Sequence, residues 1–255
     1  MTDLPVPVAG TPLYRPLHVA RLGPDAPGID ELCSFMRDAE LRFDRLRLRI
    51  LDRTHTALGE RTETVELWLR HPGAAKVISR RGTGQLSQDF DIWISDGDLV
   101  RTYHAGDNVA SVRPMRQRLA GVDSPDLPAF AKVYAPRTSL PRESIVDAFV
   151  HPNGYARNVL STGPVTLVGA TELVGDREAF LLRVDHPRIS HVLTDRPDRW
   201  IEVAVDRTTG LMLLLIEHIG DRVSRHAEVV DLEVDGPIPA ETFTLHLPDD
   251  VKMIY

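Results

Sequence analysis

Several features that define common classes of protein are scarce or missing in this chain of 255 residues. It has one cysteine, Cys33, so no disulfide can form within the chain, and a cysteine-based metal site is not expected. No stretch approaches the roughly 18 apolar residues of a membrane-spanning helix. The formal net charge of −7 argues against general nucleic-acid binding, because phosphate recognition needs a basic face. We therefore expect a soluble globular protein without a membrane span or a nucleic-acid partner.

The N-terminus also lacks a targeting signal. Residues Met1–Pro5 contain neither a basic start nor the beginning of an apolar run, so they do not form a signal peptide. The chain as given is expected in the cytoplasm, and a leader preceding it would instead direct export. Residues 1–27 are rich in proline and glycine and lack periodicity, which predicts an extended or partly disordered arm. Residues 28–255 are expected to form a single domain.

Motifs that carry catalytic chemistry are absent. No serine lies in a G-x-S-x-G elbow, and neither a Walker lysine loop nor a G-x-G-x-x-G turn occurs. The ten histidines form no H-x-H or H-E-x-x-H pair. Four acidic residues near one hairpin lack the downstream glutamate of a calcium loop and are interpreted as surface turn residues: Asp89, Asp91, Asp96 and Asp98. We predict no catalytic residue, no metal and no cofactor, and a buried, inert thiol at Cys33.

An amphipathic helix is predicted over Ile29–Phe43. Its apolar residues recur at spacings of 3, 4, 3 and 4, which places them on one helical face: Ile29, Leu32, Met36, Ala39 and Phe43. Acidic residues occupy the first turn, where the helix dipole favours them. Such a helix must cover an apolar surface elsewhere in the molecule.

The period changes to two after this helix. In Arg45–Ile50 every second residue is apolar and the others are arginine, which indicates a strand with one buried face. About ten further strand-like segments follow, joined by short glycine- and aspartate-containing turns that favour antiparallel neighbours. The last of these strands is predicted over Thr242–Leu247. Ten or eleven strands and two helices are most simply arranged as one curved antiparallel sheet.

One long stretch interrupts the strands. Residues 105–140 contain several prolines and are interpreted as a proline-rich insertion with little regular structure. Pro141 is then predicted to open a short helix that runs to about Val150, and Pro152 ends it.

The order of motifs in the second half resembles a known family. The run Glu202–Leu211 contains a D-x-x-T-G turn between two strands, and it is followed by Gly220–Val223, Val229–Asp235, Ile238–Pro239, Phe243 and Leu247–Pro248. In the first half, Glu66–Gly73 and Ile94–Gly97 agree with a strand before a proline turn and with an s-D-G hairpin. Across residues 29–104 and 165–248 the chain resembles the LolA/RseB-like superfamily of lipoprotein carriers and sigma-factor regulators, and its length is closer to the RseB-like members.

This resemblance implies a mostly β, unclosed antiparallel half-barrel whose concave face is covered by helices. It also implies an apolar cavity that holds a lipid or acyl chain. The leading hypothesis is therefore a non-catalytic acyl-chain carrier or lipid-sensing regulator. The alternative is a protein–protein interaction scaffold in which the cavity is closed.

The predicted lining of the cavity combines the alternating faces of the strands with the two helices and the insertion. It comprises Met36, Phe43, Leu67, Leu69, Ile92, Ile94, Phe130, Tyr134, Ile145, Phe149, Val203 and Val205. Each of these residues is equally well explained as ordinary core beneath the helices. Trp68 and Trp93 are expected on the opposite face of the sheet, where they pack against the N-terminal arm or form a partner surface.

Overall fold

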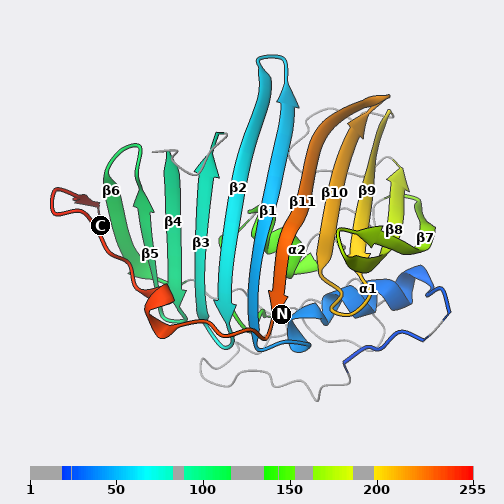
Figure 1. The fold of residues 1–255 in the computed structure, drawn as a ribbon, viewed down its shortest axis with the longest axis horizontal. Coiled ribbons are helices and arrows are strands. Elements are labelled where there is room, and N and C mark those ends of the chain that lie inside the picture. The colour runs from blue at the N-terminus through cyan, green and yellow to red at the C-terminus, as the bar shows by residue number, and fades with distance from the viewer. Residues whose placement is uncertain are drawn as a thin grey trace, which may run out of the picture.

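The structure is a computed structural model that describes residues 19–23, 25–82, 89–115, 135–142, 144–152, 163–185 and 198–254. In these residues, twelve strands form one open sheet (Figure 1). The strands are β1 (Arg45–Thr56), β2 (Gly59–Arg70), β3 (Ala74–Arg81), β4 (Phe90–Asp96), β5 (Leu99–His104), β6 (Val109–Pro114), β7 (Val165–Val174), β8 (Arg177–Asp185), β9 (Arg199–Asp206), β10 (Met212–Ile219), β11 (Arg222–Val234) and β12 (Lys252–Ile254). The helical elements are α1 (Ile29–Arg37), η1 (Ala39–Leu41), α2 (Ile145–Val150) and η4 (Ala240–Phe243).

The strands follow the order β12-β6-β5-β4-β3-β2-β1-β11-β10-β9-β8-β7. Each half of the chain forms a run of consecutive antiparallel neighbours, and the long β1–β11 pair joins the two runs at the centre of the sheet (Figure 1). The mostly β, unclosed sheet was predicted from the sequence and is confirmed. Its described part has twelve strands where ten or eleven were expected.

One face of the sheet carries the main hydrophobic core. On this face Leu48 of β1 lies directly opposite Leu67 of β2, and both are at most 2% exposed. Val203 of β9 belongs to the same buried cluster, to which α1 contributes Met36 and α2 contributes Phe149. Apolar residues of both helices are therefore buried in one cluster with residues of this face.

The D-x-x-T-G turn between β9 and β10 connects the sheet to α1. The buried carboxylate of Asp206 accepts the backbone N–H of Thr209 at 2.8 Å and a paired contact from the Arg177 guanidinium at 2.9 and 3.0 Å. Gly210 has φ +78°, and a Cβ atom there would lie 2.9 Å from the carbonyl oxygen of Phe35. This position therefore requires glycine, both for its backbone angle and for the close approach of α1.

The predicted helix over Ile29–Phe43 is wrong in its last part, because α1 ends at Arg37. A continuing helix would bond the backbone N–H of residue 39 to the Phe35 carbonyl. The Arg42 guanidinium donates to that carbonyl instead, at 2.8 Å. The carboxylate of Asp38 accepts the backbone N–H of Ala20 at 2.9 Å, which connects the N-terminal segment to the end of α1.

The second helix starts later than predicted. Its first helical residue is Ile145, where Pro141 had been expected to open it. The hydroxyl oxygen of Ser144 accepts the backbone N–H of Asp147 at 3.2 Å and so caps the first turn. The same hydroxyl donates to the backbone carbonyl of Pro141 at 2.7 Å.

Elements at one edge of the sheet also differ from the prediction. β6 lies inside residues 105–140, which were expected to hold little regular structure, while residues 116–134 are outside the described residues. The strand predicted over Thr242–Leu247 is wrong, because η4 and an unpaired extended segment occupy these residues. The C-terminal segment instead runs past the ends of β1–β4 and adds β12 to β6 as a parallel pair (Figure 1).

Candidate functional site

The pairing of β3 with β4 changes the predicted lining of the core face. Leu67 pairs with Val77, and Val77 pairs with Trp93. Because directly paired residues share a face, Trp93 lies on the core face. Ile92 and Ile94 alternate with Trp93 and therefore lie on the opposite face, so their predicted position beside Leu67 is corrected.

Both faces of β4 carry apolar residues, which explains this error. Ile94 is fully buried although it lies on the face opposite Leu67, and η4 of the C-terminal segment contacts β3 and β4. Trp68 follows Leu67 in β2 and lies on the other face of the sheet, as expected from strand alternation. Trp93 was expected on the same face as Trp68, and it lies on the other one.

Most of the other predicted lining residues are packed into the core. Seven are at most 3% exposed and belong to one cluster: Met36, Phe43, Leu67, Leu69, Phe149, Val203 and Val205. Ile145 is partly buried at the start of α2. Phe130 and Tyr134 lie outside the described residues.

An open cavity of about 320 Å³ adjoins this core, between strands β1–β4 and the start of α2. We call it the acidic cavity. It is lined by Asp52, Glu63, Val65, Val77, Ser79, Asp91, Trp93, Pro141, Ser144, Ile145 and Arg225. The cavity therefore combines an apolar floor with charged side chains, which is the composition of many sites that bind small groups.

The strand pairing places these side chains in rows across the sheet. Asp52 of β1 lies directly opposite Glu63 of β2. The next row on the same face begins with Val65, which pairs with Ser79, and Ser79 pairs with Asp91. The three carboxylates thus lie in two neighbouring rows of the core face.

Two of the three carboxylates have nearby cationic or histidine partners. Asp52 accepts a paired contact from the Arg225 guanidinium at 3.0 and 2.6 Å. Asp91 accepts a hydrogen bond from Arg81 and lies 2.7 Å from Nδ1 of His104. Within the described ranges, no hydrogen bond or ion pair joins Glu63 to another side chain.

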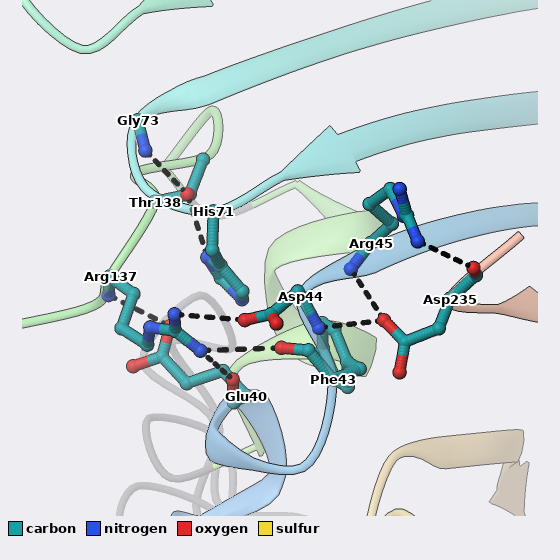
Figure 2. A network of polar contacts seen from close by, with 9 residues as sticks. All are labelled: Glu40, Phe43, Asp44, Arg45, His71, Gly73, Arg137, Thr138 and Asp235. Carbon is teal, nitrogen blue, oxygen red and sulfur yellow. Dashed lines mark hydrogen bonds and ion pairs between the residues drawn. The ribbon is translucent and has the colours of Figure 1, made fainter. Parts of the chain in front are cut away.

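A polar network beside the core holds the segment that leads to the cavity rim (Figure 2). The Thr138 hydroxyl accepts the Gly73 backbone N–H at 2.8 Å and lies 2.8 Å from Nδ1 of His71. Arg137 donates its backbone N–H to the Glu40 carboxylate at 2.8 Å. These contacts attach residues 137–138 to the β2–β3 turn and to η1, three residues before Pro141.

Two buried histidines in and beside this network differ in charge, because His71 is neutral and His151 is positively charged near pH 7. Burial, together with a smaller effect of the Arg137 charge, lowers the pKa of His71 to about 4 against the opposing charge of Glu40, so the ring is neutral near pH 7. Burial alone would lower the pKa of His151, but contacts with Asp147 and Glu40 raise it to about 9. Its Nδ1 lies 2.9 Å from Asp147 and its Nε2 lies 3.5 Å from Glu40, so the charged ring joins α2 to η1.

Solved structures show what this architecture is similar to. No family model matches the chain, and no curated protein matches its sequence. The crystal structure of MucB matches 86% of this chain with a TM-score of 0.50 and 15% sequence identity, and the match covers 62% of the MucB chain. The chain has a LolA/RseB-like fold. The sequence resemblance to this superfamily is therefore confirmed at the level of the fold.

Other solved structures match this chain with lower TM-scores. The MucA/MucB complex of Pseudomonas aeruginosa matches 86% of this chain and 61% of its own, with a TM-score of 0.47 and 17% identity. An outer-membrane lipoprotein-sorting protein domain from Vibrio parahaemolyticus matches 84% of this chain and 95% of its own, with a TM-score of 0.31 and 10% identity. The chain spans about 62% of the MucB chain.

A second cavity, of about 570 Å³, lies between the N-terminal segment and the turn after β9. Its basic side chains are Arg21, Arg42 and Arg207. The Arg42 guanidinium donates to backbone carbonyls of Phe35 and Thr209, and burial lowers its pKa to about 10. This arginine therefore connects chain segments, and we do not assign the cavity a ligand.

Two further observations concern the described part of the chain. No group of three or more His, Cys, Asp or Glu residues there has the arrangement of a metal site. No helix there has the length and apolar character needed to cross a membrane. Cys33 is buried, as predicted, and this burial raises the pKa of its thiol to about 11.

The acidic cavity could have been partly recognised from the sequence. Asp52 continues the alternation of Leu48 and Ile50, and Glu63 precedes Val65 in the same phase. A charged residue in phase with an apolar face points inward, which is unusual unless it has a partner or a function. The contribution of Trp93 had no such signal, because it depends on the register of β4.

Proposed function

We propose that this domain is a non-catalytic binding protein that holds an extended segment of a protein partner in the acidic cavity. The observation that carries the proposal is the contrast between the two parts of the core face. Buried residues of α1 and α2 share one cluster with the apolar part, whereas a cavity beside the start of α2 is lined by three carboxylates. An extended peptide offers both polar backbone groups and side chains to such a surface.

The charged lining favours a peptide over an acyl chain. An acyl chain in this cavity would remove the Glu63 carboxylate, which has no side-chain partner among the described residues, from water and offer it no hydrogen bond. Burial of a polar group without such a bond costs about 1–3 kcal/mol in proteins, and more for a charge. MucB provides a precedent for a protein partner, because it has been crystallised in complex with MucA.

Acyl-chain carriage is the second candidate, and the apolar floor supports it. Val65, Val77, Trp93 and Ile145 form a continuous set of apolar lining residues in the cavity. A ligand whose polar end lay at the carboxylates could place an apolar chain along these residues. Leu69 and Ile92 belong to the lining predicted from the sequence, but Leu69 is packed in the core and Ile92 lies on the other face. Substitutions that test this candidate must therefore be made at residues that line the cavity.

Filling the cavity tests both candidates. We expect Ile145→Trp to abolish binding of short random peptides selected on the wild-type chain, because the larger ring would occupy the space beside α2. Ser79→Phe provides a second obstruction from the sheet side. Leu58→Trp is the matched control, because Leu58 is fully exposed at the turn between β1 and β2.

The same variants are titrated with a fluorescent fatty acid. Peptide binding that is lost in both cavity variants and kept in the control supports the proposal. Saturable fatty-acid binding that the cavity variants block, without peptide binding, would replace it with acyl-chain carriage. A wild-type chain that binds neither probe would refute a ligand site in this cavity.

A further inference from the structure

We infer that the acidic cavity recognises a basic side chain, lysine or arginine, on the bound peptide segment, with Glu63 as its ion-pair partner and Trp93 as an aromatic wall. This inference rests on the proposed function and adds the chemistry of the partner. It follows from three features of the cavity: an opposed pair of like charges, an incomplete set of cations and an amphipathic lining.

The first feature is the direct opposition of two acidic residues. Asp52 and Glu63 are cross-strand partners in the β1–β2 pair. Residues so paired have their Cβ atoms about 4.5–5.5 Å apart, and like charges at this position destabilise a sheet. Both side chains line the cavity, so the repulsion is concentrated where a ligand would bind.

The second feature is that the cations near Glu63 form ion pairs with other carboxylates. The Arg225 guanidinium forms its paired contact with Asp52 and lies 3.7 Å from Glu217. Arg81 is the cross-strand partner of Glu63 on β3, yet its guanidinium contacts Asp89 at 2.8 Å and also Asp91. No cation in the described part of the chain therefore forms an ion pair with Glu63, and a ligand cation would do so.

The third feature is a lining that suits the whole of a long basic side chain. Tryptophan attracts a cation over its ring more strongly than tyrosine or phenylalanine does, and Trp93 lines the cavity. Val65, Val77 and Ile145 offer apolar surface to the aliphatic stem, which lysine and arginine bury readily while the charged end stays polar. An anionic or purely apolar side chain would leave Glu63 repelled or unpaired.

A peptide selection tests the inference on the full chain. Short random peptides are selected on the wild-type protein, on Glu63→Gln and on Glu60→Gln. The last is a matched control, since it removes the same charge from β2 at an exposed position outside the cavity. We expect lysine or arginine to be enriched next to apolar residues in peptides selected on the wild type and the control, and not on Glu63→Gln.

Affinities of individual selected peptides measure how strongly the cavity prefers a basic residue. Replacing the enriched arginine by uncharged citrulline should weaken binding to the wild type about tenfold, as the sum of a partly exposed ion pair and a cation–aromatic contact. The same replacement should change binding to Glu63→Gln much less, and Trp93→Leu should remove part of the preference. Raising the salt concentration should weaken the arginine peptide selectively.

The outcomes separate this inference from the proposed function. Peptides that bind saturably and are blocked by Ile145→Trp, but show no preference for basic residues, would refute the inference and leave the proposed function standing. Free tetramethylammonium that competes fully at similar affinity would also refute it, because a small organic cation would then be the ligand. Absence of all peptide binding would refute both.

Discussion

Replacing His151 by glutamine should remove a pH-dependent part of the protein's stability. The imidazole lies between the carboxylates of Asp147 and Glu40, at 2.9 and 3.5 Å, and only 8% of its side chain is exposed. These contacts raise its pKa from 6.5 to about 9 against the opposing effect of burial. The folded state therefore binds a proton more tightly than the unfolded state does.

The sign and size of the effect follow from this difference. A folded pKa above the unfolded value stabilises the protein fully below pH 6.5, and the stabilisation is lost as the pH rises through about 9. At about 1.4 kcal/mol for each pH unit, the upper limit is about 3 kcal/mol. We therefore expect the free energy of unfolding of the wild type to fall by about 1–3 kcal/mol between pH 6.5 and 9.

Urea titrations across this pH range measure the effect, with unfolding followed by tryptophan fluorescence. The wild type should show the decline, and His151→Gln should be less stable near pH 6.5 and nearly independent of pH above neutrality. His55→Gln is the control, because His55 lies at the exposed end of β1 with 43% of its side chain exposed. An equal decline in the wild type and His151→Gln would refute a charged His151 between the two carboxylates.

Two further predictions concern packing and charge. Phe149→Ala should lower the free energy of unfolding by about 3–5 kcal/mol, because the ring is fully buried, whereas Val230→Ala on the half-exposed face of β11 should change it by less than about 0.5 kcal/mol in the same urea assay. Glu63→Gln should raise the melting temperature slightly, corresponding to about 0.5 kcal/mol, because it relieves the repulsion with Asp52. A clear loss of stability in Glu63→Gln, unmatched in the exposed control Glu60→Gln, would mean that Glu63 already has a stabilising partner.

The Glu63 prediction links stability to function. Residues that recognise a ligand often destabilise the folded protein, which is a common trade-off at binding sites. If Glu63→Gln gains stability while losing the preference for basic peptides, the two measurements identify the same repulsion as the origin of both effects.

The sequence by itself determined the strands of the central sheet and the class of fold. Alternation in Arg45–Ile50 and the D-x-x-T-G turn after β9 are local signals, because side-chain direction in a strand and the backbone angles of a turn depend on adjacent residues. The burial of Leu32 and Met36 in α1, and of Phe43 beyond its end, was also predicted correctly from their spacing. The order of these local motifs was enough to indicate a LolA/RseB-like fold.

Only the tertiary structure decided where these elements meet. The face that β4 presents depends on its register with β3, and a shift of one residue exchanges Ile92 for Trp93. The end of α1 depends on Arg42, whose guanidinium takes the carbonyl of Phe35 that the next helical turn would use. The β6–β12 pair joins segments far apart in the chain, which local periodicity does not report. The acidic cavity arises in the same way, because its carboxylates, Trp93 and the start of α2 are brought together by strand register and by the packing of the helix.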